Sequence, residues 1–77
     1  MEELVLNIIS NLSGLESEEL LLYKDEDLFE IGILDSLSVV ALFSELNKQL
    51  NKEIKIEGYG RNDYNTINKL VSILENI

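Results

Sequence analysis

Apolar residues recur at helical spacing in three stretches of the chain, two of which lie near its ends. The first runs from Glu2 to Ser13, with glutamates in its opening turn and Gly14 directly after it as a stop signal. The last follows a cap residue at Asn65 or Thr66 and keeps its period to the final residue. The apolar positions are Leu4, Val5, Ile8, Ile9 and Leu12 in the first stretch and Ile67, Leu70, Val71, Leu74 and Ile77 in the last. Both patterns predict amphipathic helices.

The middle stretch, from Ser36 to about Leu50, carries two stripes of residues rather than one. One stripe is narrow and suits a core face, and it consists of Val39, Leu42, Phe43, Leu46 and Leu50. The second lies roughly 150° away around the helix and consists of Leu37, Val40, Ala41 and Ser44. We expect this second stripe to face solvent. Its apolar content indicates a docking surface, although scattered exposed apolar residues are also normal on proteins.

The segments between these helices lack a sustained period. Residues 15–35 are expected to form a long loop pinned to the core, with a single helical turn opening at residues 17–19. Residues 54–56 alternate like a short extended link, and residues 57–65 suit a short irregular helix. The expected apolar anchors of the long loop are Leu15, Leu20, Leu21, Leu22, Leu28, Phe29, Ile31, Ile33 and Leu34. The pattern predicts an all-α fold, a bundle of three longer helices and one short helix that forms a single domain over residues 1–77.

The charge of the chain is unevenly placed. The formal net charge is −9, and residues 1–35 hold ten acidic residues against the single Lys24, while residues 36–77 hold five of each sign. Such a surface repels nucleic acid and anionic lipid and favours partners with basic docking surfaces, unless it only keeps the protein soluble. The acidic run at residues 25–27 lacks the ligand spacing of a calcium loop and is expected to be a solvated loop.

The composition also limits the chemistry of the chain. It contains no Cys and no His, so thiolate nucleophiles, the commonest general base and the commonest metal ligands are all missing. We therefore expect a protein that is not an enzyme and that has no metal site. No apolar run is long enough for a membrane span, and the start of the chain lacks the basic residues of a signal peptide, which predicts a cytoplasmic location. Tyr59 and Tyr64 lie near Arg61 without a basic stripe, so they are expected to close the small core rather than to stack on bases.

One serine lies where chemistry can be attached. Gly32 permits a sharp turn, Asp35 or Ser36 can serve as the N-cap, and the middle helical stretch follows. A phosphodiester on the Ser36 hydroxyl would face unpaired backbone N–H groups and the positive end of the helix dipole. The alternative is that Asp35 and Ser36 are ordinary helix caps.

Residues 28–30 and Gly32, followed by residues 34–37 at the start of an amphipathic helix, resemble the acyl carrier protein superfamily over nearly the whole chain. The resemblance implies a bundle of three longer helices and one short helix, with 4′-phosphopantetheine carried on Ser36. A phosphopantetheinyl transferase would load this arm from coenzyme A with magnesium, and the terminal thiol would hold an acyl or aminoacyl group as a thioester. Partner recognition is then expected at Asp35 and Leu37 beside the serine and at Val40, Ala41 and Ser44 on the outer face of the helix.

Within the superfamily, residues 28–36 and 60–66 are similar to D-alanyl carrier proteins, and the most discriminating matches are Arg61, Thr66, Asn68 and Lys69. This similarity implies a monomeric carrier that is loaded by an adenylating ligase and serves a downstream acyltransferase or synthase. The chain departs from the usual residues of that subfamily at Leu37, Ser38, Val39, Tyr64 and Ile67.

Two alternatives stay open. One is an acyl carrier protein of fatty acid or polyketide synthesis. Carriers of fatty acid synthesis usually display acidic residues along the outer side of this helix, whereas here Glu45 is the only acidic residue within the helix. Ser38, Ala41, Asn47 and Lys48 occupy the other positions. This composition favours apolar over electrostatic docking and a dedicated ligase-loaded carrier over a fatty acid carrier. The other alternative is a small acidic helical interaction module without a cofactor.

Overall fold

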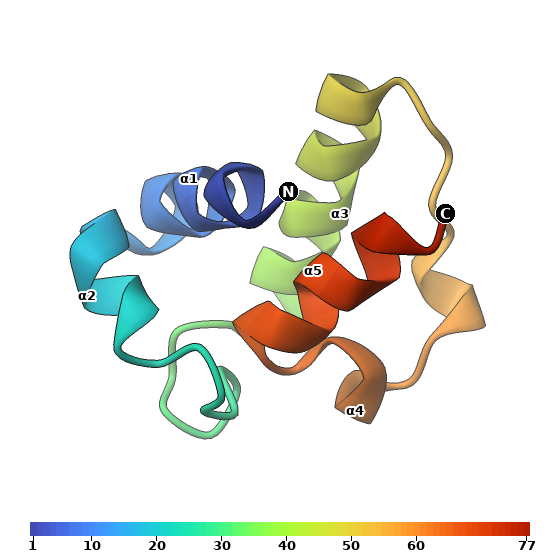
Figure 1. The fold of residues 1–77 in the computed structure, drawn as a ribbon. Helices are drawn as coiled ribbons and strands as arrows, with labels where there is room; N and C mark the ends of the chain where they lie inside the picture. Colours follow the sequence, from blue (N-terminus) through green and yellow to red (C-terminus); the bar gives the residue numbers. More distant parts are fainter.

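The computed structural model describes residues 1–77, and every regular element in it is helical (Figure 1). Three longer helices form the body, namely α1 (Glu2–Ser13), α3 (Ser36–Leu50) and α5 (Ile67–Glu75). The short elements are α2 (Ser17–Leu21), the 3-10 turn η1 (Ile56–Gly58) and α4 (Arg61–Tyr64). The expected all-α class is confirmed. The number of short helices differs from the expectation of one, because the structure has two short α-helices and a 3-10 turn.

The first helix has the expected bounds, and Gly14 ends it. Gly14 adopts φ +80°, a left-handed conformation that favours glycine, and its N–H donates to the carbonyl of Ser10. The buried face of α1 is rotated from the expected one: Leu6 is buried, whereas Leu12 is 42% exposed. Leu6 lies along a groove with residues of α2, so the short helix covers a side of α1 that the period alone assigned to solvent.

The longest helix, α3, also has the expected bounds. Its narrow stripe faces the core, with Val39, Leu42, Phe43 and Leu46 buried and Leu50 partly buried. Asn51 ends the helix in a left-handed conformation at φ 53°. Together the narrow stripe of α3 and the buried faces of α1 and α5 enclose one core, and α1 contacts both of the other helices.

The stretch of residues 15–35, which was expected to be one long loop and includes α2, contributes to that core through fewer residues than expected. Leu20, Leu28 and Leu34 are buried, and Leu15, Phe29 and Ile33 pack partly against the core. The predicted anchors Leu21, Leu22 and Ile31 are exposed instead, Leu22 to 78%. Consecutive residues of a turn point in different directions, so a loop that buries Leu20 and Leu28 must turn some neighbours outward.

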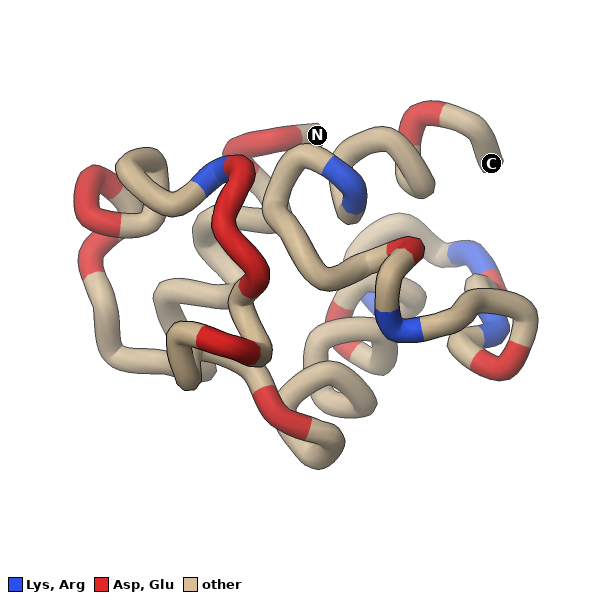
Figure 2. The backbone as a smooth tube through the Cα atoms, turned by 90° about the horizontal axis from the view of Figure 1, so that it is seen from below, with Lys and Arg blue, Asp and Glu red and all other residues tan.

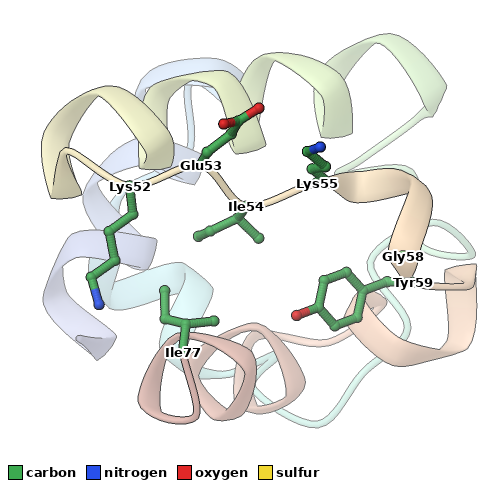
Figure 3. Close-up of a pocket in the computed structure, with 7 residues that line it drawn as sticks. All are labelled: Lys52, Glu53, Ile54, Lys55, Gly58, Tyr59 and Ile77. Atoms are coloured by element: carbon green, nitrogen blue, oxygen red, sulfur yellow. The ribbon is translucent and has the colours of Figure 1, made fainter.

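The segment after α3 returns the chain across the molecule to α4. Asn47 holds it, because its side chain accepts from the N–H of Ile54 at 2.8 Å and donates to the Ile54 carbonyl at 3.2 Å. Ile54 is buried and Ile56 partly buried, in line with the expected extended link. Figure 3 shows Tyr59 pointing into a surface pocket that Ile54 and Ile77 also line, which places this tyrosine at the edge of the core.

Charge is segregated in space as well as in sequence. Figure 2 shows most of the acidic positions on one side of the molecule, and most of the basic positions together with the remaining acidic ones on the other. Lys24, the only base among residues 1–35, lies 3.0 Å from a carboxylate oxygen of Glu2. The acidic side therefore keeps almost no free positive charge. None of the helices has both the length and the apolar character needed to cross a membrane.

We expect Leu46→Ala to lower the free energy of unfolding by about 2–5 kcal/mol, because truncating a fully buried leucine leaves a cavity. Leu37→Ala is the matched control, since it makes the same change in the same helix at a residue that is 83% exposed. Urea unfolding of both variants followed by circular dichroism measures the difference. Equal losses in the two variants would contradict the assignment of the two faces of α3.

Candidate functional site: the first turn of α3

Ser36 is the first residue of α3, and it is exposed. The residue before it, Asp35, makes the cap. Asp35 has extended backbone angles, and its Oδ1 atom accepts from the Ser38 N–H at 2.8 Å and from the Ser38 hydroxyl at 2.9 Å. The choice between Asp35 and Ser36 as N-cap is therefore settled in favour of Asp35. Because the cap does not use the Ser36 hydroxyl, that hydroxyl is available on the surface.

The electrostatics of this turn suit an anion on Ser36. The first backbone N–H groups of a helix have no partner within it, and the helix dipole places positive charge there. The Ser38 N–H, then the Ser38 hydroxyl, and more weakly the Leu37 N–H donate to the Asp35 carboxylate, and these bonds hold its pKa below the usual value. Asp35 is thus ionised at neutral pH and directed toward Ser38, one residue beyond the serine.

The loop that leads to Ser36 is a closed, hydrogen-bonded turn. The carbonyl of Leu28 accepts from the N–H groups of both Ile33 and Leu34, at 2.9 and 3.0 Å. Gly32 allows the reversal because it adopts φ +80°, which strains any residue with a Cβ atom. Leu28 and Leu34 are both buried, so the turn is attached to the core at both ends. Ser36 follows directly after this fixed turn.

Asp27 is part of this support, which corrects the expectation of a merely solvated acidic run. Its Oδ1 atom accepts from the N–H groups of Phe29 and Glu30, at 2.9 and 3.2 Å, and its Oδ2 atom accepts from the Asn65 side chain at 2.9 Å. Desolvation raises the pKa of Asp27, but these hydrogen bonds and the nearby charge of Arg61 outweigh it and lower the pKa overall. Glu26 remains exposed, as expected.

Of the four residues at which the D-alanyl carrier resemblance is most discriminating, Arg61 and Asn68 contact the loop, whereas Thr66 and Lys69 order the start of α5 and its contact with α4. The guanidinium of Arg61 lies 4.4 Å from the centre of the Phe29 ring, and Thr66 caps α5 through the Lys69 N–H at 3.1 Å. Lys69 donates from Nζ to the Asn62 carbonyl at 2.8 Å. The side chain of Asn68 donates to Asp25, and its backbone N–H donates to the carbonyl of Lys24.

An aromatic cluster fills the space beneath the loop. Tyr64 packs edge-on against Phe43 with ring centres 5.5 Å apart, and it lies 6.1 Å from Phe29. Tyr64 therefore bridges the loop and α3, which agrees with the expectation that the tyrosines close the core. The sequence reasoning treated Phe29 only as one anchor among several. Its position beneath Arg61 and beside Tyr64 depends on contacts between residues far apart in the chain.

The predicted outer stripe of α3 is mostly open. Leu37 is 83% exposed, Val40 is 56% exposed and Ser44 is exposed as well. Ala41 is only partly exposed, because it lines a groove between α3 and α1 in which Leu12 also lies. The structure thus places three of the four residues on the free face and Ala41 at its border with α1. The exposure of Leu12, which sequence reasoning missed, extends this apolar surface onto α1.

Comparisons with known proteins agree with the geometry. A family model described as a phosphopantetheine attachment site matches residues 3–74. The D-alanyl carrier protein of Streptococcus suis (strain 05ZYH33) is 40% identical over 72 residues, which is 94% of this chain and 87% of that protein. The D-alanyl carrier protein of Streptococcus pyogenes serotype M5 (strain Manfredo) is 38% identical over 77 residues, which is 100% of this chain and 94% of that protein.

Proposed function

The chain belongs to the family of carrier proteins with a phosphopantetheine attachment site, and we propose that Ser36 is the residue that holds its 4′-phosphopantetheine arm. The observation that carries this proposal is the combination of an exposed serine, a helix N-terminus and a cap made by the preceding residue. The family match includes this position. In this proposal residues 1–77 act as one carrier domain.

The residues around Ser36 fit such a group. A phosphodiester on the hydroxyl would lie at the N-terminal end of the 15-residue helix α3, where the dipole and the unpaired N–H groups favour negative charge. The Asp35 carboxylate is occupied by Ser38, which limits its repulsion of that charge. When bound, the arm supplies a thiol that can hold an acyl group as a thioester, a group that a chain without cysteine does not have. This chain contributes presentation rather than catalysis.

We infer that the cargo is D-alanine, delivered by a separate adenylating ligase in the cytoplasm and passed to a downstream acyltransferase. The similar proteins named D-alanyl carrier protein match almost the whole chain at 38–40% identity. The outer side of α3 supports the same reading, because Glu45 is the only acidic residue within that helix and a strongly electrostatic docking mode is disfavoured.

Partner recognition is proposed at the exposed residues that surround the serine. Asp35, Leu37, Val40 and Ser44 are accessible together along the first turns of α3, and Ala41 lies at the edge of this face. Covering exposed leucine and valine side chains with a partner is favourable, because it removes apolar surface from water. The phosphopantetheinyl transferase and the ligase are the partners that would use this face.

Ser36→Ala is expected to fold and to gain no arm, because alanine lacks the hydroxyl that forms the phosphodiester. Incubation with coenzyme A, magnesium and a broad-specificity phosphopantetheinyl transferase, followed by intact mass spectrometry, measures the modification. Ser72→Ala serves as the control, since it removes another exposed serine hydroxyl, on α5. A mass increase in the Ser36→Ala variant would refute the assignment of the site, and an unmodified wild-type chain would favour an interaction module without a cofactor.

Val40→Glu is expected to melt near the wild-type temperature and to lose partner activity. Burying an unpaired polar group costs about 1–3 kcal/mol and an unpaired charge costs more, so we expect kcat/KM for loading by the transferase or the ligase to fall about tenfold or more. Ser72→Glu adds the same charge at an exposed site on α5 and controls for net charge. Equal kinetics for Val40→Glu and wild type would remove Val40 from the recognition face.

The cargo is tested on the protein purified from the organism that encodes it, under conditions that preserve thioesters. Intact mass spectrometry is expected to show the phosphopantetheine arm with one added alanyl group. Mild alkaline hydrolysis of the thioester releases the group as free alanine, and digestion with a D-amino acid oxidase is then expected to identify the D enantiomer. A long acyl chain or a polyketide on the arm would contradict the D-alanine assignment and leave the carrier assignment intact.

A further inference from the structure

Asn65 joins the C-terminal half of the chain to the loop that leads to Ser36. Its side chain Nδ2 donates to Oδ2 of Asp27 at 2.9 Å, and its backbone carbonyl accepts from the N–H of Leu28 at 2.7 Å. The residue is only 6% exposed, although asparagine is usually found at the surface. Thr66, the next residue, caps α5. The position of Asn65 is therefore set by the start of a core helix.

Hydrogen bonds continue without a break from Asn65 to the residues beside Ser36. The Leu28 carbonyl accepts from the N–H of Leu34, which immediately precedes the cap residue Asp35. Asp27 holds the intervening turn, because its other carboxylate oxygen accepts from the N–H groups of Phe29 and Glu30. Two bonds from Asn65 thus fix one end of a short turn whose other end leads into the serine.

The side-chain oxygen of Asn65 indicates that this residue serves the geometry of the loop rather than stability. Its Oδ1 atom is buried and has no hydrogen-bond partner in the protein. Leaving a buried acceptor unpaired is unfavourable, and native proteins do so rarely. An unfavourable group that is nevertheless present in a buried network is more often found where a function requires its position.

We propose that Asn65 is a positioning residue for the modification of Ser36, and that together with Asp27 it holds residues 27–35 in the one arrangement that the modifying enzyme recognises. This inference rests on the proposed attachment at Ser36. If the loop adopts other conformations, the enzyme must select a less populated competent state, and its apparent affinity falls by the fraction lost. The effect is therefore expected chiefly in KM for the carrier, with a smaller change in kcat.

A pair of exchanges tests the proposal. Asn65→Asp opposes two carboxylates across the 2.9 Å contact, and we expect KM to rise about tenfold or more. Asp27→Asn keeps an acceptor for Phe29 and Glu30, and the Asn65 amide can rotate to present its unpaired oxygen, so KM should stay within a few-fold of wild type. In the double variant Asp27→Asn/Asn65→Asp an amide again faces a carboxylate across this contact. We expect its KM to return most of the way to the wild-type value, which would show that the two side chains are directly coupled.

Leu74→Ala is the control for general destabilisation, because it truncates a buried core residue of α5 that belongs to none of these hydrogen bonds. All variants are assayed at a temperature at which circular dichroism shows them folded. Leu74→Ala is expected to keep the wild-type KM. Hydrogen exchange at the Leu28 and Leu34 amides is expected to quicken in Asn65→Asp and to return toward wild type in the double variant. If Asn65→Asp does not fold, Asn65→Ala, which removes only the side-chain bond, takes its place and should show a smaller rise in KM.

Three results would overturn the proposal: a folded Asn65→Asp variant with the wild-type KM, an equal rise in KM for Leu74→Ala, or a double variant that recovers nothing. Failure of the proposed attachment at Ser36 looks different. In that case the wild-type chain gains no arm or Ser36→Ala gains one, whereas the amide exchange still reports whether Asn65 orders the loop.

Discussion

Leu28 is completely buried, and it is the constraint that connects the core of the molecule to the turn before Ser36. Its side chain lies in the core, its N–H is bound by the carbonyl of Asn65, and its own carbonyl closes the turn before α3. One residue is therefore part of the core and part of the support of Ser36. A chain of 77 residues has too little interior to separate these roles, so its loop must supply core side chains.

The attachment of the loop to the core explains why an exposed serine can be held in a defined place. Loops are usually mobile because few of their side chains are buried. Here Leu20 in α2 is buried just before the loop, Leu28 and Leu34 attach the loop itself to the core, and Asp27 closes the turn between those two leucines. An enzyme that binds a carrier with such a preorganised loop does not have to order the loop first, so binding costs less conformational entropy.

Charge and exposed apolar side chains occupy different parts of the surface. The acidic side of the molecule, which residues 1–35 dominate, can attract a basic partner from a distance, and this attraction weakens as salt increases. The outer face of α3 adds exposed apolar residues and little charge, with Leu37 and Val40 next to the serine. The acidic and the exposed apolar surfaces thus belong to different elements, while the opposite face of α3 contributes Leu42 and Leu46 to the core.

The all-α class, the bounds of α1 and α3, and the candidate serine follow from the sequence, because they depend on local physics. A 3.6-residue period defines each helix, Gly14 ends α1, and α3 and α5 each have two adjacent cap candidates, of which the structure uses Asp35 and Thr66. The tertiary structure in turn selects which side chains of residues 15–35 are buried and places Leu6 rather than Leu12 inside. It alone joined Asp27 to Asn65. Those outcomes depend on neighbours far along the chain, and no local pattern records which distant residue covers a given side chain.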